Sequence, residues 1–432
     1  MEGLIAFAPS ALRRVTRAFA CRSAVCVAAL LLLTPPRASA YSVLAHEACV
    51  DALWEPSIKP LLVRRFPRAT AADIQAARAY AYGGSVIQDV GYYPFGSRFF
   101  SNLVHYVRSG DFVEALLRDA ADVNELGFAI GALAHYVTDN VGHPEGVNKS
   151  VPLMFPKLRA KYGDVVTYVQ SPSSHVIVEF SFDIVQIAAG AYLPDTYHNF
   201  IGFQVARPLL ARAFQETYGL DINDVFLDEN LAIGTYRRSV SELIPEFTRM
   251  AWNDKKEEIA RLIPGVQESA FVYTYTREQY EKEFGTGYHK PGWLARVIGF
   301  LYRLLPKIGP LKPLAFKTPT PEAERLFETS FKDARARYGA ALAQIARGAV
   351  DLPNMNFDIG TPATRGTYRL ADDAYAELLD RLAHRKFAGV PAALRTDITS
   401  YYAHGFDEAA SRKERKRAKK IAEQLAEMAS TR

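Results

Sequence analysis

The chain has 432 residues, of which 49% are hydrophobic and 23% are charged, close to the averages of globular proteins. This composition excludes wholesale disorder, collagen and coiled-coil rods, and three cysteines exclude a disulfide scaffold. The formal charge of +5 is concentrated at the two ends, so the body between residues 41 and 410 carries about −4. Such a body lacks the main driving force of non-specific nucleic-acid binding.

The first forty residues have the pattern of a secretory signal peptide. Four arginines precede an apolar run over residues 24–33, and Ala38-Ser39-Ala40 forms a cleavage site of small residues. The run is too short to cross a bilayer of ~30 Å as a helix. We therefore expect a secreted or periplasmic protein that is cleaved after Ala40 and begins at Tyr41, with an uncleaved anchor as the alternative.

Helical periodicity dominates the remaining chain, so the expected fold class is mainly α. A capping box over residues 70–73 predicts a helix that ends at Gly83-Gly84. A second helix is expected over residues 111–133, and a long amphipathic helix over residues 320–347. Residues 164–170 are the best candidate for a short strand.

The chain is expected to divide into a first domain and a helical C-terminal region. We place the signal peptide at residues 1–40, the first domain at 41–210, the C-terminal region at 211–410 and a basic tail at 411–432. Within the C-terminal region, residues 351–368 have the composition of a loop.

Histidines and carboxylates recur at helical spacing in the first domain. His135, Asp139 and His143 are four residues apart, which places them on one face of a helix. His175 and Glu179 repeat the same spacing. Neutral imidazoles and carboxylates are the ligands that Zn²⁺ takes when thiolates are absent. The pattern therefore indicates a metal site, with buried structural histidines as the alternative.

Other residues of the first domain extend this set. Asp89 follows a glycine-rich turn, and His105 lies in a short apolar segment. His46 lies five residues after Tyr41, whose α-amine becomes able to bind a metal once cleavage exposes it and it loses its proton.

The order of these residues resembles the zinc-dependent phospholipase C superfamily. That superfamily includes bacterial phospholipases C, fungal single-strand nucleases and the amino-terminal domain of glycosylphosphatidylinositol-specific phospholipase D. The resemblance covers about residues 41–186 and implies a multi-helix domain that holds two to three zinc ions in one cleft. It differs in two places: Tyr41 stands where a tryptophan is usual, and three residues instead of five separate Asp139 from His143.

The resemblance also implies which residues share each zinc ion. One ion would be held by Asp89, His105, His135 and Asp139. A second would be held by His143, His175 and Glu179. The third would be held by the amine and carbonyl of Tyr41, by His46 and by a bridging Asp139.

Clustered zinc ions can polarise a phosphoryl oxygen and lower the pKa of a bound water to about 7. Asp89 is either a plain ligand or the general base that acts on the attacking water. Glu145 and Asp183 are expected beside the metal ligands, in contact with them or at the edge of the cleft.

Two segments outside the metal site have features of membrane-binding sequences. Residues 293–316 combine basic, aromatic and apolar residues at helical spacing, which suits either a helix in a bilayer interface or a helix packed on the metal domain. Residues 412–420 are strongly basic and suit either an anionic surface or a solvated helix end.

The sequence thus predicts a secreted zinc-dependent phosphodiester hydrolase, similar to phospholipases C and D, that acts on a phospholipid head group. Its expected partners are a phospholipid or another phosphodiester substrate and the membrane surface, with no obligate protein partner. One alternative is a nuclease with the same zinc site, which alone would bind nucleic acid. Another is a non-catalytic metal-binding surface protein.

Overall fold

The computed structural model describes residues 43–188, 203–240, 316–403 and 412–431, together with residues 252, 256–257, 259–261 and 265. These residues form helices and loops without a strand, and their one isolated bridge pairs Asn356 with Thr361. The expectation of a mainly α fold is confirmed. The signal peptide, Tyr41 and residues 293–315 of the predicted interface segment lie outside the described residues.

The helices of the first half are α2 (Val43–Leu53), η1 (Trp54–Ile58), α3 (Lys59–Arg65), α4 (Ala71–Ile87), η2 (Gln88–Tyr92), α5 (Arg98–Tyr106), α6 (Ser109–Asp119), α7 (Val123–Val141), η3 (Gly142–Val147), α8 (Asn148–Met154), α9 (Pro156–Tyr162) and α10 (Pro172–Ala188). Those that follow are α12 (Arg207–Tyr218), η4 (Ile222–Asp224), α13 (Glu229–Arg238), α17 (Pro321–Ala346), α18 (Arg369–His384), α19 (Ala392–Tyr402) and α20 (Arg412–Ser430).

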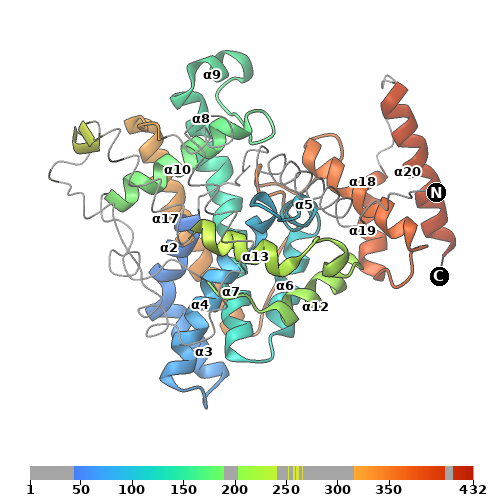
Figure 1. Cartoon of the computed structure of the whole chain (residues 1–432), viewed down its shortest axis with the longest axis horizontal. Coiled ribbons are helices and arrows are strands. Elements are labelled where there is room, and N and C mark those ends of the chain that lie inside the picture. The colour runs from blue at the N-terminus through green and yellow to red at the C-terminus, as the bar shows by residue number, and fades with distance from the viewer. Residues whose placement is uncertain are drawn as a thin grey trace, which may run out of the picture.

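Helices α4 and α7 pack against each other at the centre of the molecule (Figure 1). Glycines make this close approach possible: a Cβ atom at Gly84 would lie 1.8 Å from the carbonyl oxygen of Phe128, and one at Gly131 would lie 1.9 Å from that of Ala81. Only residues without a side chain fit at these two contacts. The backbones of α4 and α7 therefore touch, which fixes the groups at the C-terminal end of α4 relative to α7.

Helix α17 covers α7 from the C-terminal half of the chain and also contacts η3, α8 and α2. The hydroxyl of Tyr338 donates a hydrogen bond to the carbonyl oxygen of Ile130 at 3.0 Å, and both groups are buried. One hydrophobic core extends from Val43 in α2 to Met428 in α20. The domain boundaries at residues 210 and 410 remain predictions.

Helices α18, α19 and α20 lie together at one edge of the molecule (Figure 1). The rings of Tyr375 and Tyr401 stack with centroids 3.6 Å apart, and α18 packs against both α5 and α20. The basic start of α20 is largely exposed, although Arg417 forms an ion pair with Asp373 at 2.7 Å. No helix in the described part of the chain has the length and apolar character needed to cross a bilayer.

The structure confirms some of the predicted elements and corrects others. The capping box at Thr70 is present, and the long helix begins at Pro321 as expected. The helix that begins at Ala71 does not end at Gly83-Gly84 but continues to Ile87, because Gly84 packs against α7 and Gly83 against the backbone of Gln204. The expected helix over residues 111–133 is two helices, since Asp122 caps a new one. Residues 164–170 form turns and no strand.

Candidate metal centre

Eight of the nine predicted metal ligands come together in the interior of the protein, and the ninth, Tyr41, lies outside the described residues. They are contributed by six different helical elements, and every one of the eight is buried: His46, Asp89, His105, His135, Asp139, His143, His175 and Glu179. Three groups of these side chains have ligand atoms close enough to share a metal ion. The sequence pattern thus identified residues that are far apart in the chain and adjacent in space.

The first metal position is formed by Asp89, His105, His135 and Asp139. The Nε2 atom of His105 lies 3.4 Å from Nε2 of His135, 3.3 Å from Asp89 Oδ1 and 3.6 Å from Asp139 Oδ2. The Nε2 atom of His135 lies 3.1 Å from Asp139 Oδ2 and 3.9 Å from Asp89 Oδ1. Ligands bound tetrahedrally to zinc at 2.0–2.2 Å are about 3.4 Å apart, so these spacings fit one shared ion.

Backbone carbonyl groups fix the two imidazoles of this position. His105 Nδ1 donates to the carbonyl oxygen of Ser101 at 2.7 Å, and His135 Nδ1 donates to that of Ser85 at 2.9 Å. Because a carbonyl oxygen can only accept, Nδ1 of each ring carries a proton, and in the neutral form that binds a metal the lone pair is on Nε2. Both lone pairs therefore point toward the carboxylates of Asp89 and Asp139.

Asp89 is held in place by the neighbouring helices. The side-chain amide of Gln88 donates to the carbonyl oxygen of Ala132 in α7 at 3.0 Å. The backbone N–H of Gly91 donates to the hydroxyl of Ser101 in α5 at the same distance. These two contacts join η2 to the helices that carry His135 and His105, so the carboxylate of Asp89 reaches both rings.

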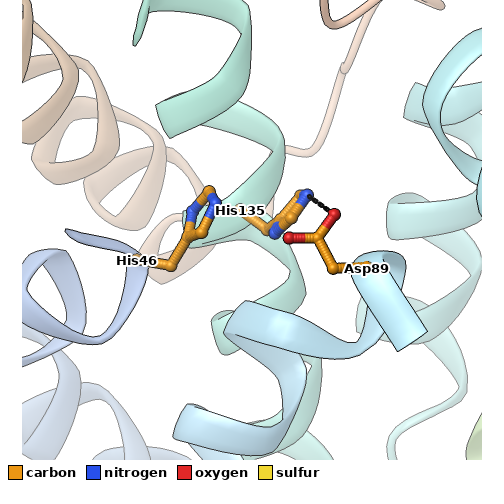
Figure 2. A group of neighbouring side chains, drawn as sticks. All are labelled: His46, Asp89 and His135. Atoms are coloured by element: carbon orange, nitrogen blue, oxygen red, sulfur yellow. Dashed lines mark ion pairs between the residues drawn. The ribbon is translucent and has the colours of Figure 1, made fainter. Parts of the chain in front are cut away.

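His46 approaches the same carboxylates from α2. Its ring stacks on that of His135 with centroids 4.1 Å apart, and its Nε2 lies 3.4 Å from Asp139 Oδ1. Figure 2 shows His46 and Asp89 on either side of His135, with each side chain coming from a different helix. Asp139 therefore contacts His46 as well as the two histidines of the first metal position.

The electrostatics of Asp139 suit a cation. Burial raises the pKa of this carboxyl, but the imidazoles of His135 and His46 outweigh it and hold the pKa well below its usual range. Burial alone would lower the pKa of His135, whereas Asp139 and Asp89 raise it to about 9. Neither oxygen of Asp139 has a hydrogen bond of good geometry to any residue that the structure describes. A bound cation would satisfy these buried acceptors.

The second metal position is formed by His143, His175 and Glu179. The rings of His143 and His175 stack with centroids 5.2 Å apart, and His175 Nδ1 lies 2.6 Å from Glu179 Oε1. Burial lowers the pKa of His175 to about 3 and, together with Asp89 and Asp139, raises that of Glu179 well above its usual value. The histidine is therefore neutral, which is the state that a metal ligand requires.

A π-helical turn brings His143 to this position. The sequence predicted His135, Asp139 and His143 on one face of a single helix, but α7 ends at Val141 and His143 lies in the π-helix η3. Its Nε2 lies 3.7 Å from Asp139 Oδ2. Asp139 therefore contacts both metal positions, and η3 is an example of a π-helix at a functional site.

Two polar residues of the second position were missed by sequence reasoning. The side-chain oxygen of Asn148 accepts from His175 Nε2 at 2.6 Å, while its amide donates to the backbone carbonyl of Asp358 at 2.6 Å. The carboxylate of Asp358 lies 3.0 Å from His143 Nδ1 and 3.7 Å from His175 Nε2. Asp358 lies in the predicted loop over residues 351–368, and nothing in its local sequence indicates a contact with residues two hundred positions earlier.

The carboxylate of Asp358 is charged despite its burial. Burial opposes the charge, but the contact with His143 and the proximity of His175 and of the Tyr368 hydroxyl together hold the pKa below its usual value. The backbone N–H of Tyr168 also donates to Asp358 Oδ2 at 3.2 Å. The second position is therefore surrounded by side chains from distant segments.

The two residues expected beside the ligands lie in different surroundings. Asp183 is buried, and its carboxylate accepts a hydrogen bond from the backbone N–H of Leu44 at 3.3 Å, two residues before His46. Glu145 is exposed and forms an ion pair with Lys149 on the surface of η3 and α8. Asp183 thus holds the start of the helix that carries His46, whereas Glu145 points away from the ligands.

Residues 45–227 match the family model described as zinc dependent phospholipase C. The search of curated proteins and the search of solved structures found no match. The matched range contains all eight described ligand candidates and excludes Asp358.

Proposed function

Residues 45–227 belong to the zinc-dependent phospholipase C family, and we propose that the protein is an exported hydrolase that cleaves the head-group phosphodiester of a phospholipid. The observation that carries this proposal is the geometry around Asp139. Imidazole nitrogens from α5 and α7 and the carboxylate of Asp89 are spaced for a shared ion, and the Nε2 atoms of His105 and His135 point inward. Imidazoles and carboxylates are ligands that suit zinc, and we propose two to three ions per chain.

Zinc ions held there would supply Lewis-acid polarisation of a phosphoryl oxygen and would lower the pKa of a water molecule toward 7. The protein supplies the arrangement around them. Carbonyl groups of Ser85 and Ser101 keep two imidazoles in the tautomer that leaves Nε2 available. Asp139 contacts histidines of both positions, so it sets the distance between them.

Asp89 has two roles open to it. Its Oδ1 atom lies 3.3 Å from His105 Nε2, which suits a ligand, and a carboxylate at this place also suits a general base that takes a proton from water. Changing Asp89 to Asn separates the two, because the amide keeps an oxygen but cannot accept a proton. A variant that keeps its zinc and loses turnover identifies a base, and one that loses zinc identifies a ligand.

The test of the proposal combines metal analysis with a lipid assay. Purified mature protein is expected to contain two to three zinc ions per chain and to release phosphorylated head group from mixed phospholipid vesicles. Exhaustive chelation is expected to abolish the release. Full activity after complete removal of metal would rule out zinc-dependent hydrolysis.

The same preparation tests the alternatives. Cleavage of single-stranded DNA with no release of head group would identify a nuclease, which the shared metal site allows but the acidic body disfavours. Bound zinc without either activity would identify a metal-binding surface protein.

The proposal includes export, because cleavage after Ala40 would make the amine of Tyr41 a ligand near His46. His46 lies 3.4 Å from Asp139. These two residues alone are too few ligands for a zinc ion, so a third ion shared by them needs further ligands. A variant that keeps one extra residue before Tyr41 is expected to bind its most labile zinc more weakly. Unchanged metal content and turnover would show that the terminus is not a ligand.

A further inference from the structure

The segment from Leu352 to Thr361, which we call the C-terminal loop, lies against the metal centre although it follows the family-matched residues by more than a hundred positions. The backbone N–H of Phe357 donates to the carbonyl oxygen of His105 at 3.2 Å. The ring of Phe357 lies 5.1 Å from that of His105 and 6.0 Å from that of His135, measured between centroids. The loop therefore forms one wall of the centre.

The C-terminal loop is also held there by contacts with α6 and α7. The hydroxyl of Ser109 in α6 accepts from the backbone N–H of Met355 at 2.9 Å, and the side chains of Asn354 and Asp111 contact each other at 3.0 Å. The hydroxyl of Tyr136 in α7 donates to the carbonyl oxygen of Pro353 at 2.7 Å. Because these partners come from the helices beside the ligands, the loop has a defined position relative to the centre.

Three histidines beside Asp139 share one arrangement. His105, His135 and His143 each direct Nε2 toward Asp139. The Nδ1 atoms of the first two donate to backbone carbonyl oxygens. The Nδ1 atom of His143 instead lies 3.0 Å from Asp358 Oδ1, close enough for an ion pair but without the alignment of a hydrogen bond. A carboxylate behind a metal-bound imidazole fixes its tautomer and orientation.

We propose that Asp358 is a positioning residue that holds His143 in the orientation needed to bind zinc at the second metal position. The inference rests on the proposed zinc centre. Asp358 is itself held by the backbone N–H of Tyr168 and by Asn148, which also contacts His175. The C-terminal loop thus completes a metal site whose ligands all come from the family-matched segment.

The experiment measures zinc affinity of the full chain with a competing chelator. Asp358→Ala is expected to weaken one zinc ion per chain by about 10- to 100-fold, the usual effect of removing such a partner. Asp358→Asn keeps an acceptor without the charge and is expected to weaken it less. Asp351→Asn is the matched control, because Asp351 is exposed and lies just before the C-terminal loop.

A double variant shows whether Asp358 acts through His143. In a His143→Ala background, Asp358→Asn is expected to have no further effect on zinc affinity, since the imidazole that it positions is gone. Equal effects of Asp358→Asn in both backgrounds would overturn the inference. Two results for a folded Asp358→Ala protein would also overturn the inference. One is that it holds all its zinc as tightly as wild type, and the other is that it loses every zinc ion together.

The outcomes for Asp358 and for the proposed function are separate. Wild-type protein that binds zinc but releases no head group would reject the hydrolase and leave the positioning role standing. If Asp358→Ala does not fold, Asp358→Asn provides the same measurement. An unchanged affinity in the folded Asn variant, with a normal content of zinc in wild type, would overturn the positioning role alone.

Discussion

The two metal positions are built in different ways. At the first position, His105 and His135 are held by backbone carbonyl groups of α5 and α4, within the tight contact of α4 and α7. At the second position, His143 and His175 are held by the side chains of Asp358 and Asn148. Helix packing thus fixes one position, whereas the other depends on polar side chains from distant segments. We expect the second position to lose its zinc first during chelation.

The largest effect is expected where the two positions meet. Asp139 contacts His135 and His105 on one side and His143 on the other. Asp139→Ala is therefore expected to empty both positions and to reduce activity to below about 1% of wild type, since even indirect partners of a ligand matter by 10- to 100-fold. Zinc content and the rate of head-group release measure the effect. A variant in which one metal position still holds its zinc would show that the two positions are independent.

A pair of histidine variants separates the two positions. His135→Ala is expected to lose the first zinc and to lower the melting temperature strongly, because metal-binding energy is also folding energy. His175→Ala is expected to lose only the second zinc, with a smaller change in melting temperature. Metal analysis and thermal unfolding of both variants provide the comparison. Equal losses of zinc and equal decreases in melting temperature in the two variants would contradict the proposed difference between the two metal positions.

An intermediate effect is expected from the contact of α4 with α7. In Gly84→Ala the new Cβ atom would lie 1.8 Å from the carbonyl oxygen of Phe128, so the helices must separate, at a cost of about 1–3 kcal/mol or more. The first zinc should be held more weakly and the second unchanged. Gly234→Ala is the control, because no atom lies within 4 Å of its Cβ position. Equal chelation curves for the two variants would show that helix packing does not set the first position.

The smallest effect on zinc binding is expected from a change outside both metal positions, which separates the effect of pH on folding from its effect on the metal. Burial raises the pKa of Asp397 to about 6, and the carboxylate accepts from Tyr375 at 3.0 Å. The folded protein keeps this proton at a pH where the unfolded chain has already lost it. The free energy of unfolding therefore falls as the pH rises from about 4 to about 6.

Asp397→Asn removes the charge and keeps an acceptor for Tyr375. The variant is expected to be more stable than wild type at pH 7.5, by up to about 3 kcal/mol, and equally stable at pH 3.5. Denaturant unfolding of metal-free protein at both values measures the difference. A gain of the same size at pH 3.5 would assign the effect to packing instead of charge.

The sequence predicted the helical fold and the ligand types because both depend on local spacing. His135 and Asp139 are one helical turn apart, and the same holds for His175 and Glu179. The contacts of Asp358 and Asn148 depend instead on how distant segments pack, which no local pattern contains. The predicted helix end at Gly83-Gly84 was wrong for the same reason. Glycine weakens an isolated helix, but here Gly84 permits close contact with α7 and Gly83 with the backbone of Gln204.

Helix α17 also determines how the protein can be divided for experiments. It buries Phe327, Tyr338 and Leu342 against the core, and the hydroxyl of Tyr338 reaches α7. A fragment that ends at residue 227 would expose the apolar surface that these side chains cover, and such surface promotes aggregation. Recombinant work on the metal centre therefore requires the chain through α20. Low solubility of the shorter fragment would result from the apolar surface of α7 that α17 no longer buries.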